Sequence, residues 1–125
     1  MRVDSLDHLV LTVADVDASA DFFARVLGME KVAFGAGRIA LRFGRQKINL
    51  HPAAAPLVPH AAQPARGSGD LCFITQQDLS EWIAHLAKCG VMVEVGPVLR
   101  TGALGPMTSI YIRDLDGNLI EIAQY

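Results

Sequence analysis

Two residues near opposite ends of the chain carry groups that bind metals or transfer protons. His8 lies in the alternating, β-branched stretch DHLVLTV (7–13), and Glu121 interrupts the hydrophobic run LIEI (119–122). Glutamate is depleted in strands, so this carboxylate marks either the polar face of a strand or a site that uses its charge. Imidazole and carboxylate groups are ligands of catalytic divalent metals and also act as general acids and bases.

An internal repeat gives both residues a counterpart. The strand-like stretch at 7–13 precedes a helical pattern that ends at Gly28, and DLCFIT (70–75) precedes another that ends at Gly90. His8 and Asp70 are 62 residues apart, as are the two glycines. The spacing predicts a strand and a helix in each half, with Asp15 or Asp17 capping the first helix.

Three further strand-like runs follow the glycine in each half. They are 31–34, 38–43 and 47–51 in the first half, and 92–95, 109–113 and 118–123 in the second. Aligning INL (48–50) with IEI (120–122) places Asn49 opposite Glu121, 72 residues later. The second half therefore has about ten extra residues, which we assign to a Gly- and Pro-rich loop at 95–106.

These patterns predict an α+β fold in a single domain. Two βαβββ modules, at about 5–52 and 69–125, are expected to form a curled, cup-shaped mixed sheet with the helices outside, because each module must bury an apolar face. The segment 53–68 reads as a linker, since residues 51–69 contain four of the six prolines.

Composition excludes several classes of protein. The chain has 125 residues, 51% of them hydrophobic and 19% charged, as in globular proteins. The eleven Lys and Arg residues are scattered and the net charge is -2, so no nucleic-acid partner is expected. No apolar run or leader-like pattern predicts a membrane or secretory segment, which favours a cytoplasmic location. Cys72 and Cys89 lack metal-binding spacing and are interpreted as reduced core thiols.

Several motifs resemble the vicinal oxygen chelate superfamily, which includes glyoxalase I, bleomycin-resistance proteins, fosfomycin-resistance enzymes and extradiol dioxygenases. The resemblance rests on the opening DHLVLTVADVDASADFFARVLGM (7–29), the duplicated βαβββ pattern and the closing RDLDGNLIEI (113–122). A narrower similarity, to the branch called glyoxalase domain-containing protein 5, rests on KINLHP (47–52), GSGDLCFIT (67–75) and RTGALGPMTSIYIRDLDGNLIE (100–121).

The resemblance implies a divalent metal held by the first and last strands of each half. The corresponding positions are His8, Asn49, Asp70 and Glu121. His8 and Glu121 match the family pattern, whereas Asn49 stands where glyoxalase I has a carboxylate or amide ligand and Asp70 where a histidine is usual. Asp70 is otherwise interpretable as a turn residue.

His51 is an alternative ligand because it lies two residues beyond Asn49 and therefore on the same face of its strand. A set of two histidines with carboxylates suits nickel, zinc, manganese or iron. If Asn49 and Asp70 complete the set instead, the oxygen-rich site favours manganese or magnesium. The remaining histidines, His60 and His85, are expected on the surface.

These inferences predict a small metal-dependent enzyme of lyase or isomerase type, glyoxalase-like, acting on a small molecule with adjacent oxygens. Glu121 serves as ligand, catalytic base or both, while Arg100 in the long loop, Tyr111 and Asn49 bind substrate. The alternatives are a metal-free, ligand-sequestering protein of the bleomycin-resistance type and an extradiol dioxygenase that uses His51. The resemblance also implies a homodimer.

Overall fold

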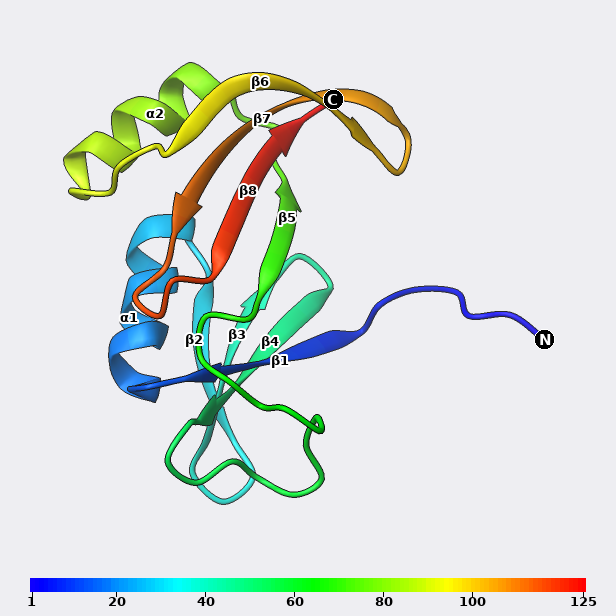
Figure 1. Cartoon of the computed structure of the whole chain (residues 1–125), viewed down its shortest axis with the longest axis vertical. Coiled ribbons are helices and arrows are strands. Elements are labelled where there is room, and N and C mark those ends of the chain that lie inside the picture. The colour runs from blue at the N-terminus through cyan, green and yellow to red at the C-terminus, as the bar shows by residue number, and fades with distance from the viewer. The chain divides into compact units, whose positions relative to one another are not determined.

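The computed structural model describes all 125 residues, which divide into two compact units, Met1–Gly67 and Ser68–Tyr125 (Figure 1). Each unit is a four-stranded mixed sheet with one helix, in the order strand, helix and three strands. The predicted α+β fold with two βαβββ modules is confirmed. Neither helix has the length and apolar character needed to cross a membrane.

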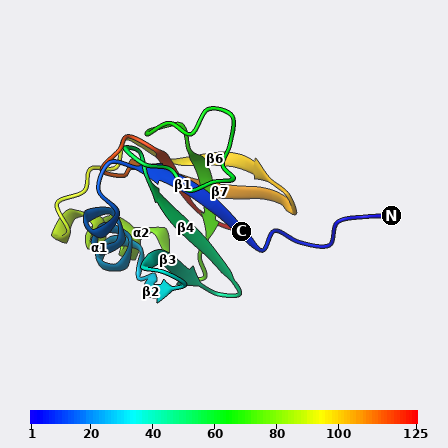
Figure 2. The same cartoon turned by 90° about the horizontal axis from the view of Figure 1, so that it is seen from below.

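The first unit has its strands in the order β1-β4-β3-β2, side by side in Figure 2 with α1 on one side of them. Only the β1–β4 pair is parallel. The elements are β1 (His8–Val13), α1 (Val16–Leu27), β2 (Glu30–Phe34), β3 (Arg38–Phe43) and β4 (Gln46–Pro52).

Local sequence explains both ends of α1. The Asp15 side chain accepts a hydrogen bond from the Ala18 amide at 2.9 Å, which caps the N-terminus. Gly28 follows the last turn with a φ of 67°, a conformation that glycine adopts without steric cost. The buried face of the helix, which includes Phe23 and Val26, packs against β2, β3 and β4. Of the two predicted caps, Asp15 is therefore the one used.

The second unit repeats this arrangement in the order β5-β8-β7-β6, with β5 and β8 parallel. Its core contains four fully buried isoleucines of β7 and β8 together with Leu86 of α2. Trp82 of α2 also donates a hydrogen bond from Nε1 to the Thr75 hydroxyl at 2.9 Å. The elements are β5 (Asp70–Ile74), α2 (Leu79–Lys88), β6 (Val95–Gly102), β7 (Gly105–Arg113) and β8 (Leu119–Gln124).

Strand register reproduces the repeat that the sequence shows. His8 lies opposite Lys47 in the first sheet, and Asp70 lies opposite Leu119 in the second. These pairs are related by the same offsets of 62 and 72 residues found in the sequence. The predicted correspondence between Asn49 and Glu121 is therefore correct at the level of strand pairing.

Two predictions for the second unit are wrong. The strand expected at 92–95 is irregular up to Val95, and the loop expected at 95–106 is β6 together with the start of β7. Proline and glycine suggested a loop, but β6 is an edge strand whose register shifts between Val95 and Val98. Edge strands and bulges tolerate proline because one side of the strand makes no ladder hydrogen bonds.

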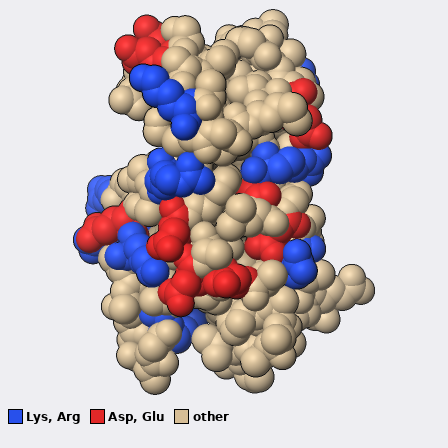
Figure 3. Space-filling view, turned by 90° about the vertical axis from the view of Figure 1, so that its left-hand side faces the viewer, with Lys and Arg blue, Asp and Glu red and all other residues tan.

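Many charged side chains form ion pairs. Acidic and basic side chains are interspersed on the face drawn in Figure 3. Across the chain, Lys31 lies 3.2 Å from Asp17, and Arg42 lies 2.7 Å from Glu30. The Asp17 carboxylate accepts a hydrogen bond from Lys31 and raises the pKa of that amine. Paired cations of this kind are less available to a phosphate backbone than a run of unpaired ones.

A buried hydrogen-bond network holds the turn between β7 and β8. The Asp114 carboxylate accepts hydrogen bonds from the Asn118 side chain at 2.7 Å and from the Asn118 amide at 2.8 Å. The Asn118 side-chain oxygen in turn accepts a hydrogen bond from the Gly69 amide at 2.7 Å. Asn118 is only 1% exposed and Asp114 8%. The network thus joins the starts of β5 and β8, which carry Asp70 and Glu121.

We predict that Asn118→Ala lowers the free energy of unfolding by about 2–4 kcal/mol, because it leaves the Oδ2 atom of Asp114 and the Gly69 amide without their partner. Urea denaturation followed by circular dichroism measures the change. Gln76→Ala, at an exposed position that follows β5, is the control and should change stability by less than about 0.5 kcal/mol. Equal stability of the two variants would contradict the role given to the network.

Candidate functional site

His8, Asn49 and His51 project from the same face of the first sheet. In the register of β1 and β4, Val10 lies opposite Asn49 and Thr12 opposite His51. Alternation places His8, Val10 and Thr12 on one face, while Leu11 and Val13 are buried on the other, toward the core. The prediction that His51 shares a face with Asn49 is confirmed.

The His8 imidazole is oriented by its neighbour in sequence. His8 Nδ1 lies 2.7 Å from the Asp7 carboxylate, and the His8 side chain is 44% exposed. Because a carboxylate accepts hydrogen bonds, this contact places a proton on Nδ1, so that in the neutral ring the lone pair is on Nε2. A carboxylate behind an imidazole is the usual arrangement in histidine metal ligands.

Asn49 is buried, and its side-chain oxygen has no hydrogen-bond partner. A buried amide oxygen without a partner is destabilising. It therefore represents a preformed acceptor for a cation or for a hydrogen-bond donor on the same face as His8.

His51 differs from His8 in what its ring contacts. It is 3% exposed, and Nε2 lies 3.4 Å from Nη2 of Arg38, whose guanidinium can only donate. Burial, then the positive charge of Arg38, then His60 lower the pKa of His51. The ring is therefore neutral at pH 7, with the lone pair of Nε2 directed at a cation. This contact is unfavourable for a metal ion at Nε2.

A pocket of about 440 Å³ in the second unit contains the predicted residues of that half. Three carboxylates, those of Asp70, Glu94 and Glu121, lie in it together with the predicted substrate-binding residues Arg100 and Tyr111. The lining residues are Asp70, Glu94, Val95, Arg100, Tyr111, Arg113, Leu119 and Glu121. Asp70 therefore lines a pocket, although it begins a strand directly after a glycine-rich turn.

Glu121 is partly buried at the centre of its sheet. Cys72 of β5 and Tyr111 of β7 flank it on the two neighbouring strands. Its Oε1 atom is buried without a hydrogen-bond partner. Desolvation, and next the Glu121 carboxylate, raise the pKa of the Cys72 thiol to about 11. The raised pKa of Cys72 thus reflects, in part, the negative charge of Glu121 on the adjacent strand.

Arg100 and Tyr111 contact each other in this pocket. Nε of Arg100 donates to the Tyr111 hydroxyl at 3.1 Å, and the guanidinium lies 5.5 Å from the ring centroid. The expected position of Arg100 in a loop is wrong, since it lies on β6. An arginine supported by an aromatic ring suits an anionic or hydroxylated ligand.

Sequence pattern did not predict the positions of three residues that contact or flank these side chains. The prediction that Cys72 is a core thiol is wrong, because Cys72 is exposed. Its position two residues after Asp70 on an alternating strand could have indicated that it shares the face of Asp70. Arg38 reaches His51 across the β3–β4 pair. His60 is exposed, as expected, but it lines a pocket with His51.

The candidate metal ligands are divided between the units, with His8, Asn49 and His51 in the first and Asp70 and Glu121 in the second. No group of three or more His, Cys, Asp or Glu side chains lies close enough together to hold a metal ion within either unit. Each unit places two of the predicted ligand positions diagonally across a pair of parallel strands, His8 with Asn49 and Asp70 with Glu121.

The chain is similar in sequence and in fold to several known proteins. The virulence protein STM3117 of Salmonella typhimurium is 50% identical over the whole chain, which covers 87% of that protein. An integron cassette protein from the mobile metagenome of V. cholerae is 54% identical with a TM-score of 0.98, covering 100% of this chain and 98% of the other. Lactoylglutathione lyase from Agrobacterium tumefaciens is 26% identical with a TM-score of 0.74, covering 98% and 95%.

Residues 5–122 match the family model described as the glyoxalase/bleomycin resistance protein/dioxygenase superfamily. The match spans both units and includes His8, Asn49, Asp70 and Glu121. The chain therefore belongs to the glyoxalase/bleomycin resistance protein/dioxygenase superfamily.

Proposed function

We propose that the protein is a small metal-dependent enzyme of lyase or isomerase type that acts on a small molecule with two adjacent oxygens. The observation that carries the proposal is the buried, unpartnered carboxylate oxygen of Glu121 in a pocket that also contains Asp70. Such an oxygen is costly unless a cation or a donor compensates it. Membership of the superfamily and the similarity to a lactoylglutathione lyase support this class of reaction.

The donor groups suit a divalent metal. Under the proposal, His8 Nε2 and the Glu121 carboxylate hold the ion, with the Asn49 side-chain oxygen and the Asp70 carboxylate as further ligands. One imidazole with oxygen donors suits manganese, iron, nickel or zinc. His51 is left out of this set because Arg38 faces its Nε2 atom at 3.4 Å. The same contact argues against a dioxygenase, which would need His51 as a second imidazole ligand.

The proposal requires ligands from both units. His8 and Asn49 belong to the first unit, and Asp70 and Glu121 belong to the second. We further propose that the protein is a homodimer. Light scattering of the purified protein distinguishes a monomer from the proposed dimer.

Under the proposal, residues of the second unit transfer the proton and bind the substrate. A divalent metal held by these ligands would supply Lewis-acid polarisation of a substrate carbonyl. Glu121 takes the proton from the carbon beside that carbonyl and returns it to the neighbouring carbon. The guanidinium of Arg100, supported by Tyr111, holds an anionic or hydroxylated part of the substrate in the pocket.

Metal analysis tests the proposed ligands. Protein purified without a histidine tag and reconstituted with Mn²⁺, Fe²⁺, Ni²⁺ or Zn²⁺ should retain about one ion per chain after gel filtration, measured by inductively coupled plasma mass spectrometry. His8→Ala should lose the ion, and Asp7→Asn should weaken its affinity by about tenfold or more, because Asp7 orients the His8 ring.

The matched control is His85→Ala, which removes an exposed histidine of α2 and should retain the ion. Failure of the reconstituted protein to retain any of the four metals would reject the enzyme proposal. Ligand binding by such metal-free protein would favour the sequestering function instead.

Turnover tests the proton transfer by Glu121. With the hemithioacetal of methylglyoxal and glutathione as the first substrate probe, Glu121→Gln should lower kcat by about a hundredfold or more, because the amide keeps an oxygen donor but cannot accept the proton. Glu81→Gln on α2 is the control and should retain full activity. Unchanged kcat in Glu121→Gln protein with full metal content would exclude this role.

Thiol reactivity tests the charge of Glu121 independently of any metal. In a Cys89→Ala background, alkylation of Cys72 by iodoacetamide should be slow at pH 7. The rate should increase as the pH is raised toward the Cys72 pKa of about 11, because the thiolate is the reactive form. Glu121→Gln removes the negative charge beside the thiol, lowers its pKa and should speed alkylation at pH 8. Mass spectrometry measures the rate, and equal rates would show that Glu121 does not act on Cys72.

A further inference from the structure

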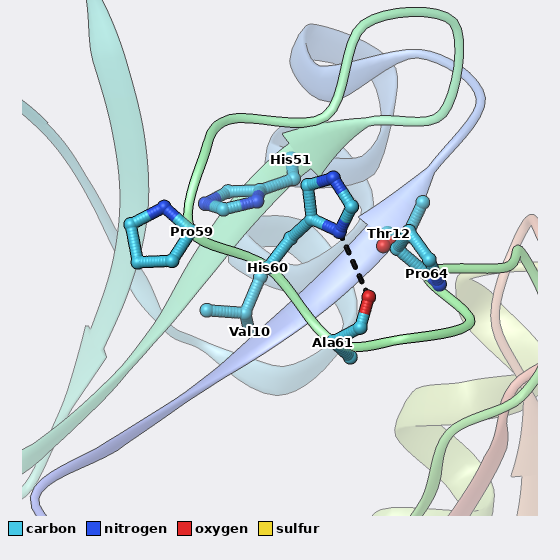
Figure 4. Close-up of a pocket in the computed structure, with 7 residues that line it drawn as sticks. All are labelled: Val10, Thr12, His51, Pro59, His60, Ala61 and Pro64. Atoms are coloured by element: carbon cyan, nitrogen blue, oxygen red, sulfur yellow. Dashed lines mark hydrogen bonds between the residues drawn. The ribbon is translucent and has the colours of Figure 1, made fainter.

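A second pocket lies entirely within the first unit, under the proline-rich segment that follows β4. Its volume is about 420 Å³, within the range of small-molecule sites. The lining residues come from β1, from β4 and from that segment: Val10, Thr12, His51, Pro59, His60, Ala61 and Pro64. In Figure 4 the rings of His51 and His60 lie next to each other, near Val10 and Thr12. None of the four residues proposed above to hold a metal lines this pocket.

Arg38 fixes the hydrogen-bonding character of His51. A guanidinium only donates, so its contact with Nε2 at 3.4 Å requires the lone pair at that atom. With the lone pair on Nε2, the ring proton is on Nδ1. This atom is buried and has no hydrogen-bond partner. His51 therefore has a buried N–H donor whose acceptor is missing, and His51 is one of the residues that line the pocket.

His60 offers a hydrogen-bond acceptor, whereas His51 offers a donor. Its Nδ1 atom lies 2.8 Å from the Ala61 carbonyl oxygen, which only accepts, so Nδ1 carries a proton and in the neutral ring the lone pair is on Nε2. The remaining lining consists of Val10, Ala61 and two prolines, together with the Thr12 hydroxyl. The pocket thus combines an apolar wall with a fixed donor at His51.

The same assignment disfavours a metal ion bridging the two rings. Coordination through His51 Nδ1 would move the ring proton to Nε2, against the donating guanidinium of Arg38. A cationic ligand is disfavoured for the same reason, since an N–H donor and the Arg38 charge face it. An oxygen that accepts a hydrogen bond satisfies the buried donor at no such cost.

We propose that this pocket binds a small, uncharged molecule with an apolar body and a carbonyl or ether oxygen, which accepts a hydrogen bond from His51 Nδ1. Val10, Pro59 and Pro64 contact the apolar body. The segment 53–67 acts as the roof of the site in addition to linking the units. This binding does not depend on the metal-dependent reaction proposed above.

Cyclohexanone is the probe, because it combines a six-carbon ring with one carbonyl oxygen. Titrated into the full-length, isotope-labelled and metal-free protein, it should produce saturable shifts of the His51 and His60 imidazole signals in long-range ¹H–¹⁵N spectra and of the Thr12 amide. The His51 signals should show the Nδ1–H form before and after addition. Cyclohexylammonium, which only donates, should bind at least tenfold more weakly. Cyclohexanecarboxylate should also bind more weakly than the ketone, because burying its charge against Val10, Pro59 and Pro64 costs more than one N–H donor returns.

Two variants and one control test the assignment. His51→Phe keeps a ring but removes the donor and should weaken ketone binding by about tenfold, the upper range for one hydrogen bond. Ala61→Leu, at an exposed position in the roof, fills the pocket without altering the core and should abolish binding. His85→Phe on α2 should bind as the unmodified protein does.

Three results would overturn the proposal: no saturable shift with cyclohexanone, unchanged ketone affinity in the Ala61→Leu variant, or binding of the ammonium or carboxylate probe that is tighter than that of the ketone. The first result would mean that water alone occupies the donor of His51. Because the titration uses metal-free protein, its failure is distinguishable from a failure of the metal analysis.

Discussion

The geometry of the second unit depends on one buried hydrogen-bond network, formed by Asp114, Asn118 and the backbone of Gly69. It ties the turn before β8 to the residue that precedes β5, and these are the two parallel strands that place Asp70 and Glu121 on one face. Parallel strands are not neighbours in sequence, so their pairing needs contacts of this long-range kind. An asparagine serves here because it can donate to a carboxylate and accept from an amide at once.

A common pattern links the two pockets. All the buried side-chain atoms that lack partners, on Asn49, His51, Ser109 and Glu121, lie on strands of the two sheets. They occupy the faces opposite the fully buried residues Ile48, Ile110 and Ile122. Unpaired buried polar groups are costly and uncommon in proteins, so their concentration on these faces is the physical basis for both proposals. The pocket of the second unit is lined by carboxylates and arginines and suits a charged ligand or an ion. The pocket of the first unit suits an uncharged ligand whose oxygen accepts a hydrogen bond.

Sequence pattern was most informative where local rules act alone. Alternation, the Asp15 cap and Gly28 predicted the first strand and helix, and the offsets of the repeat predicted the strand register in both units. The pattern failed at β6, where glycine and proline suggested a loop although an edge strand with a bulge tolerates both. It also misjudged Cys72, because alternation predicts the face of a strand but not which face is covered.

The sequence by itself thus determined the two modules, the positions of His8, Asn49, Asp70 and Glu121, and which strand face each side chain occupies, because the period of a strand is a local property. Tertiary structure decided which groups meet across strands: Arg38 with His51, Glu121 with Cys72, and Arg100 with Tyr111. Such contacts set the proton positions and charges of a site. They join residues far apart in the chain, and sequence spacing alone does not encode them.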